Sequence, residues 1–235
     1  MYNVPSINPD KEKELENILS EMSNIVANNS LPDLEQRYAQ QFLECAHKLF
    51  LAWKPTMKRI ASKEVAENSF WGFFERFLNE CENGSWSGMA RHKPAIERFK
   101  QELYNVVSQM LLSKTNINEV ANIIRNTTMP SGANKIDGLT AFPMTGILFA
   151  SDEDNFMILD EPVLGYFGLN ENYNDALSNY KYIIDKSRSY SIEFNLSMWY
   201  VNKAYGILSN GKSLPLKKLC GNCFGKTFTN HIFNF

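Results

Sequence analysis

Residues 8–27, NPDKEKELENILSEMSNIVA, indicate most clearly which class of fold this chain adopts. Asn8 is a good helix N-cap, and Pro9 suits the first position of a helix. The apolar residues that follow recur every three or four positions, which places them on one stripe of a helix. They are Leu15, Ile18, Leu19, Met22, Ile25 and Val26. The stretch therefore predicts an amphipathic helix that ends at the polar residues 28–30.

The same spacing of apolar residues recurs along most of the chain. A second helix is predicted to open at Ser30–Pro32, to close at Pro55 and to form an antiparallel hairpin with the first, because a short loop makes neighbouring helices pack on each other. Further helices are predicted over 56–82 with a break near Ala61–Ser62, over 93–113, after the cap Asn116, over 139–150, over 160–167, over 173–190 and over 196–209. The fold class expected is an all-α, multi-helix globule without a sheet of three or more strands.

Length and composition fit one helical domain. The chain has 235 residues, of which 44% are hydrophobic, so that a sizeable core can form. We expect a single domain over 1–209, with a possible subdivision into 1–130 and 131–209. Residues 210–235 lack helical periodicity, and we expect an irregular carboxyl-terminal tail there.

Several function classes are disfavoured by what the sequence lacks. The start of the chain does not read as a signal peptide, and no window approaches the ~20 apolar residues of a membrane span, so we expect a cytoplasmic protein without a membrane partner. Cys220 and Cys223 form a Cys-x-x-Cys pair with His231 beyond it, but zinc requires a fourth ligand, and none lies nearby. We expect no metal, and no cofactor either, since a Gly-rich phosphate loop is absent.

Charge is unevenly distributed along the chain. The formal net charge is −2, whereas proteins dedicated to nucleic acids usually carry a basic excess. The amino end is acidic and the carboxyl end basic. Any binding of DNA or RNA should therefore use the basic carboxyl-terminal region and weaken steeply with salt. The candidate residues are Lys186, Arg188, Lys203, Lys212, Lys217 and Lys218.

Two other local patterns each allow a structural and a functional interpretation. The run Phe70–Phe77 is apolar around much of a helix, which is typical of a helix buried on more than one side, and alternatively of an aromatic pocket for a small molecule. Residues 152–154, three consecutive acids, favour a solvated turn over a cation site, because the Gly and the closing Glu of a calcium loop are missing.

A stretch in the carboxyl half carries a resemblance to a known family. Residues 138–169 read GLTAFPMTGILFASDEDNFMILDEPVLGYFGL. The segment resembles the hairpin and following helix of helix-hairpin-helix DNA glycosylases, with residues 158–163 at the place of the family's Val-Asp-Thr-His-Val motif and Gly168-Leu169 at the place of its Gly-Leu. It is also similar to degenerate, non-glycosylase relatives in bacterial restriction and phage-defence proteins. The resemblance covers about 138–205.

The resemblance implies roles for a few residues. Asp160 occupies the position of the catalytic aspartate, although an Asp before Glu-Pro-Val is also a typical helix N-cap. Gly138 matches one hairpin glycine, while Thr140 stands at the second. The 136–169 stretch holds six acids and no Lys or Arg, and such a surface repels phosphate.

Three functions follow as hypotheses. The first is a non-catalytic helical interaction module that binds a protein or nucleic-acid partner, with prokaryotic or phage defence as the setting that the resemblance implies. The second is a divergent DNA glycosylase that uses Asp160 as its catalytic carboxylate. The third is a small-molecule sensor whose pocket is lined by Phe70–Phe77.

Overall fold

The computed structural model describes residues 5–27, 37, 40–41, 44, 47–48, 50–80, 92–169 and 172–209. Helix accounts for 72% of these residues, and none of them forms a strand, which confirms the prediction of an all-α globule. The labelled helices are α1 (Pro9–Ala27), α3 (Lys54–Ala61), α4 (Glu67–Glu80), α6 (Lys93–Glu97), α7 (Lys100–Leu112), α8 (Ile117–Thr128), α9 (Ala141–Ser151), α10 (Glu161–Tyr166), α11 (Tyr173–Ser178), α12 (Tyr180–Glu193) and α13 (Met198–Ser209).

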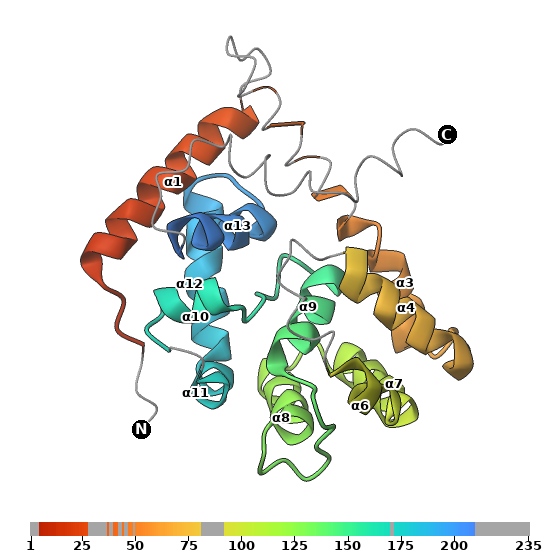
Figure 1. Ribbon diagram of the computed structural model, residues 1–235. Coiled ribbons are helices and arrows are strands. Elements are labelled where there is room, and N and C mark those ends of the chain that lie inside the picture. Colours follow the sequence, from red (N-terminus) through yellow and green to blue (C-terminus); the bar gives the residue numbers. More distant parts are fainter. Residues whose placement is uncertain are drawn as a thin grey trace.

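One group of helices gathers around α13. Helix α1 packs against α13, so that the first and the last labelled helices are neighbours, and α10 and α12 also pack against α13 (Figure 1). The partner predicted for α1 was the following helix, but residues 28–36 and much of 38–49 lie outside the described residues. The antiparallel hairpin therefore stays a prediction.

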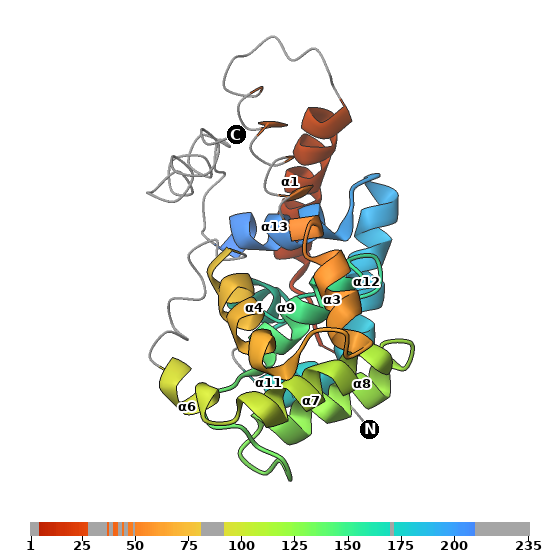
Figure 2. The same cartoon turned by 90° about the vertical axis from the view of Figure 1, so that its right-hand side faces the viewer.

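A second group of helices gathers around α7. Helices α3, α4, α6, α8 and α9 all pack against it, and α3 also packs on α9 (Figure 2). Helix α8 contacts both α11 and α12 and so joins this group to the α13 group. None of the helices within the described ranges is both long and apolar enough to cross a bilayer.

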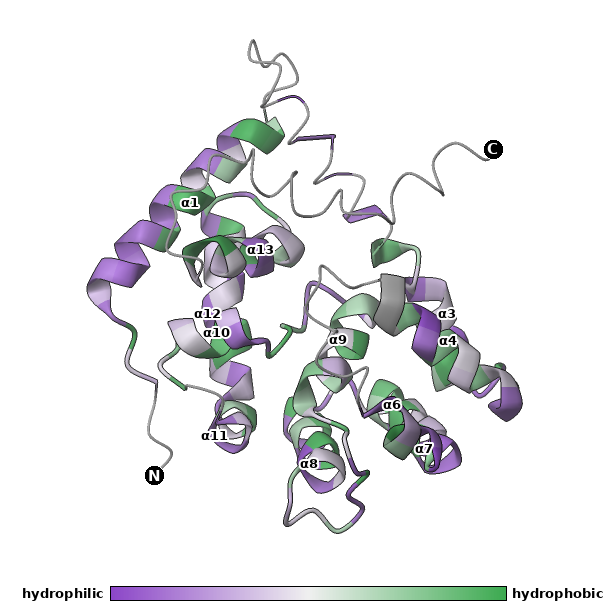
Figure 3. Ribbon diagram, in the orientation of Figure 1, coloured by the Kyte–Doolittle hydropathy of each residue, from purple (hydrophilic) through white to green (hydrophobic). Residues whose placement is uncertain are grey.

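The core is one continuous cluster of buried hydrophobic side chains that runs through both groups. Helix α9 is buried on nearly all sides, and Figure 3 shows hydrophobic residues along it. The segment 156–159 that follows α9 is also largely buried, with its polar backbone satisfied internally: the amide of Leu159 donates to Thr145 Oγ1 (3.0 Å) and the hydroxyl of Tyr180 donates to the carbonyl of Met157 (2.7 Å). These bonds fix the chain immediately before Asp160.

Several helix starts agree with the caps predicted from the sequence. Asn8 Oδ1 accepts the amide of Asp10 (2.9 Å) at the start of α1, and Asn116 Oδ1 accepts the amide of Glu119 (3.2 Å) at the start of α8. The predicted break near Ala61–Ser62 separates α3 from α4. Pro55, however, does not close a helix. It lies in the first turn of α3, where its missing N–H has no intrahelical partner to lose.

Two helices predicted as continuous are divided. The 93–113 helix is α6 and α7, because the amide of Phe99 bonds to the carbonyl of Ile96, three residues back, and tightens the turn (2.9 Å). The 173–190 helix is α11 and α12, separated at Asn179. The side-chain amide of Asn179 donates to the carbonyl of Asp175 (2.9 Å), and such a local bond competes with regular helix hydrogen bonding.

Candidate functional site

Asp160 caps helix α10. Its backbone is extended, and its Oδ1 accepts the amide of Val163 at 3.1 Å, while Pro162 lies in the first turn. The carboxylate thus satisfies one of the free amides at the start of the helix. The structural role that the sequence predicts for Asp160 is present in the fold.

The surroundings of Asp160 disfavour its charge. Burial raises the pKa of Asp160 to about 6 from an ordinary 3.8, although the amide of Val163, the ammonium of Lys203 and the side chain of Asn202 each act to lower it. Lys203 and Asn202 both come from α13, which packs against α10. A carboxyl group with such a pKa exchanges its proton close to neutral pH, a property that is also found in catalytic acids and bases.

A hydrogen-bonded His–Glu pair packs against the same helix, α13. His47 Nε2 is 2.7 Å from Glu153 Oε2, and the two side chains are only 16% and 10% exposed. The imidazole stacks on Trp199, with ring centroids 5.1 Å apart, and meets the edge of Tyr200 at 5.6 Å. On Trp199 there is a further contact with Lys203, whose Nζ is 5.1 Å from the ring centroid. The pair and Asp160 are thus linked through Trp199 and Lys203.

The acidic turn 152–154 is not the solvated turn that the sequence favours. Glu153 is buried because it pairs with His47, Asp152 lies 3.7 Å from the ammonium of Lys114, and the carbonyl of Asp154 accepts Arg188. These partners could not be predicted from the sequence, since His47 lies 106 positions before Glu153. Within the described ranges, no three His, Cys, Asp or Glu side chains are grouped so that they could hold a metal ion. Cys220, Cys223 and His231 lie outside those ranges.

Two of the basic residues predicted to contact nucleic acid, Lys186 and Arg188, are bonded within the protein. Lys186 Nζ lies 2.6 Å from Glu12 Oε1 and sits over the ring of Tyr190. Arg188 donates to the carbonyl of Asp154 (3.1 and 3.2 Å) and to Asn155 Oδ1 (3.0 Å). Three further candidates lie outside the described residues: Lys212, Lys217 and Lys218.

The two glycines of the family resemblance have structural reasons of their own. Gly138 has a φ of +83°, and a Cβ there would come within 2.7 Å of the Cβ of His92. Gly168, with a φ of +69°, ends α10: the amide of Leu169 bonds to the carbonyl of Leu164 (2.8 Å) in the pattern of a Schellman cap. Both positions therefore call for glycine because of the chain's own backbone.

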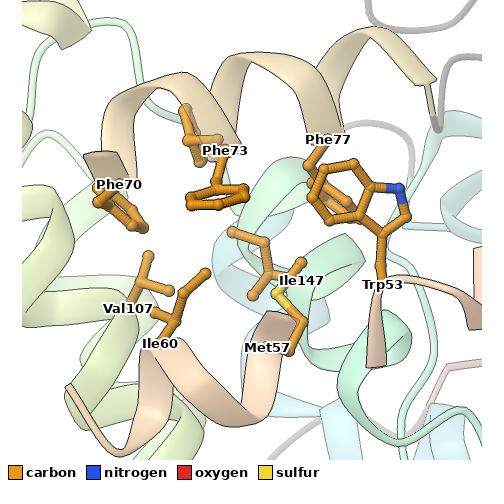
Figure 4. Close-up of a pocket in the computed structure, with 9 residues that line it drawn as sticks. Trp53, Met57, Ile60, Phe70, Phe73, Phe77, Val107 and Ile147 are labelled. Atoms are coloured by element: carbon orange, nitrogen blue, oxygen red, sulfur yellow. The ribbon is translucent and has the colours of Figure 1, made fainter. Parts of the chain in front are cut away.

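The aromatic run of α4 faces α3. Phe70 and Phe77 point toward Met57 and Ile60 across a small void, which Trp53 also lines (Figure 4). The volume of this void is about 10 Å³. That is enough for about one water molecule, whereas sites for organic ligands have volumes of a few hundred Å³.

No family model matches the chain, and no curated protein and no solved structure is matched by it. The fold is therefore classified as all-α and no further. A functional inference has to start from the residues described above.

Proposed function

We propose that this chain is a non-catalytic helical interaction module that binds a protein or nucleic-acid partner. The observation that supports the proposal is that the candidate reactive side chains are bonded to groups of the protein itself. Asp160 accepts Val163, His47 pairs with Glu153, and Arg188 is held on the 154–155 turn. Side chains used in this way stabilise the fold.

The charges near Asp160 also favour an interaction module over a DNA glycosylase. An enzyme that extrudes a base from DNA requires a basic groove around its catalytic carboxylate, because the phosphates on both sides must be bound. Here Glu161 follows Asp160 directly, and the acidic turn 152–154 precedes it in the same region of chain. Lys203 is the cation that acts on the Asp160 carboxyl group.

A divergent DNA glycosylase is the second candidate, and one observation favours it. The pKa of Asp160 is raised to about 6 by burial, which suits a group that takes up a proton at neutral pH. Under this alternative Asp160→Asn keeps the helix cap but removes the negative charge that stabilises a cationic transition state.

The deciding experiment is a base-excision assay on duplex DNA that carries damaged or mismatched bases, with melting curves of the natural protein and Asp160→Asn. We expect no base release by either protein. If the natural protein releases a base and Asp160→Asn does not, while the melting temperature of the variant is not lowered, the glycosylase hypothesis is correct and the interaction module is wrong.

The setting is also part of the proposal. The resemblance of residues 138–205 to modules of restriction and phage-defence proteins is the reason for proposing a cytoplasmic role in prokaryotic or phage defence. The third hypothesis, a small-molecule sensor, gains no support from the α4 void, which has room for about one water molecule.

A further inference from the structure

We propose that helix α3 carries a binding surface for the phosphate backbone of a nucleic acid, made by Lys54, Lys58, Arg59 and Lys63. This inference rests on the proposed function and specifies the partner of the module. It also moves the expected contact from the carboxyl-terminal cations, of which Lys186 and Arg188 are bonded within the protein, to the opposite half of the fold. These four residues are named below as the α3 cations.

The α3 cations differ from Lys186 and Arg188 in their bonding within the described part of the chain. Lys58, Arg59 and Lys63 are exposed and Lys54 is partly so, and no side chain of the four makes an ion pair or hydrogen bond with a described residue. Lys186 and Arg188, in contrast, have protein partners at hydrogen-bond distance. Unpaired cations gain most from phosphate, because no existing ion pair has to be broken.

Two of the α3 cations are placed against the local preferences of the backbone. Lys54 stands in the first turn of α3, where the positive end of the helix dipole disfavours a cation. Lys63 has a φ of +58°, in the left-handed region, at the position after a helix where glycine is preferred. The amides of Lys63 and Glu64 bond to the carbonyls of Ile60 and Arg59, which fixes this conformation. The helix dipole accounts for Lys58 and Arg59 near the other end, but not for these two lysines.

Helix α3 is held in place by its packing on the core. Met57 and Ile60 are buried, and α3 packs on α7 and α9, so the opposite side of α3 is held outward. Lys54 and Lys58 are four residues apart within α3, which gives a rise of about 6 Å between the two charges. Arg59 lies in the last turn of the helix, and Lys63 follows just after its end. Arg76 of α4 lies over the ring of Trp53, the residue before Lys54, and adds a charge at this end. Glu64 and Glu67 are the exposed acids that follow in sequence.

The composition of the surface favours nucleic acid over an acidic protein. Protein–protein interfaces are depleted in lysine and are centred on aromatic or aliphatic anchors. Three of the four α3 cations are lysines, and the large hydrophobic residues that are exposed in the described part of the chain, Leu112 and Ile192, lie on α7 and α12. Lysine ammonium groups bind phosphates as point charges. A lysine-rich surface without an apolar anchor therefore fits the phosphate backbone of a nucleic acid.

The test is fluorescence anisotropy with labelled 20-nucleotide single-stranded and duplex DNA at 50 to 200 mM salt. The test variant combines Lys58→Glu, Arg59→Glu and Lys63→Glu. The control variant makes the same change in net charge at exposed cations elsewhere, with Lys13→Glu, Lys135→Glu and Lys181→Glu. We expect the natural protein and the control to bind, and the test variant to lose at least tenfold in affinity. Its salt slope should also be shallower by about 2 to 3 on duplex DNA, because three phosphate contacts are lost.

A second variant separates binding from stability. Lys63→Gly relieves the left-handed backbone, so we expect a melting temperature higher by about 1 to 3 °C together with weaker DNA binding. A merely structural lysine would not show both changes. Equal affinity of the test variant and the natural protein for DNA would show that the α3 cations do not form the binding surface. If the natural protein binds polyglutamate and does not bind DNA, the partner is an acidic protein and the nucleic-acid proposal is wrong. The base-excision assay on Asp160 is independent of all these outcomes.

Discussion

Lys186 Nζ lies 2.6 Å from Glu12 Oε1, and this ion pair joins α12 to α1 across 174 positions of sequence. The same Glu12 oxygen accepts the hydroxyl of Tyr190 at 2.8 Å, and Tyr190 is in turn 2.7 Å from the hydroxyl of Tyr166. Because Lys186 and Tyr190 both bond to the ionised form, the pKa of Glu12 is lowered from 4.5. The network thus ties α1 to α10 and α12 through one carboxylate.

Glu12→Gln should reduce the free energy of unfolding at pH 7 by about 1 kcal/mol, since it removes a partly exposed ion pair and weakens one hydrogen bond. The folded-state pKa lies below 4.5, so the stabilisation is present above pH 4.5 and is lost as the pH falls through the lowered value. Urea unfolding at pH 7 and pH 3 measures this. The matched control is Glu14→Gln, an exposed residue on the same helix. A loss that is equal at both pH values would contradict the role of the charge.

The His47–Glu153 pair should contribute to stability as a unit. Glu153→Ala leaves a mostly buried imidazole without its partner, and we expect a loss of about 1 to 3 kcal/mol. A double-mutant cycle with His47→Ala measures the coupling between the two side chains. Asp154→Ala is the control, because Asp154 contacts Arg188 only through its backbone carbonyl. Strictly additive losses in the cycle would show that the pair is not coupled.

Asp160→Asn should be at least as stable as the natural protein at pH 8. The folded pKa of about 6 lies above the ordinary 3.8, so ionisation of the buried carboxyl group reduces stability as the pH rises through about 6. Asparagine caps the helix as well and stays neutral, which predicts an advantage of up to about 2 kcal/mol above pH 6 and none below pH 3.8. Asp160→Ala should lose about 1 kcal/mol at acidic pH, where only the cap differs. Thermal melts across pH 3.5 to 8 test this; a lower stability of Asp160→Asn at pH 8 would contradict it.

Two glycine substitutions should act in opposite directions. Gly138→Ala places a methyl group 2.7 Å from the Cβ of His92 at a φ of +83°, and we expect a loss of about 1 to 3 kcal/mol. Gly72→Ala, within α4, meets nothing within 4 Å and should stabilise the protein by about 0.5 to 1 kcal/mol. Guanidinium unfolding of both variants provides the comparison. An unchanged midpoint for Gly138→Ala would show that the 137–140 loop adapts.

The helices could be predicted because their signals are local. Asn8, Asn116 and Asp160 each cap a helix through an amide two or three residues away, and apolar stripes recur within single turns. The divisions at Phe99 and Asn179 were missed, since they depend on single hydrogen bonds that do not interrupt the apolar stripe.

The candidate site was less accessible from the sequence. Asp160 could be singled out from its cap pattern, but the partners of Glu153 and Lys186 lie more than a hundred positions away. Pairs of this kind are set by tertiary packing and leave no periodicity in the sequence. The backbone of Lys63 was equally hidden, because a lysine gives no sign that its φ will be positive.

The pairing of α1 with α13 has a consequence for synthesis. Ser23 Oγ donates to the carbonyl of Phe194 (2.6 Å), 171 positions later, and the apolar stripe of α1 is covered by α13. At ribosomal rates of 5 to 20 residues per second, roughly 10 to 30 s pass between the emergence of the two helices. Throughout that interval the stripe formed by Leu15, Leu19, Met22 and Ile25 has no native cover from α13. The nascent chain therefore exposes this apolar stripe until α13 has been made, and α1 docks only after the other described helices have been made.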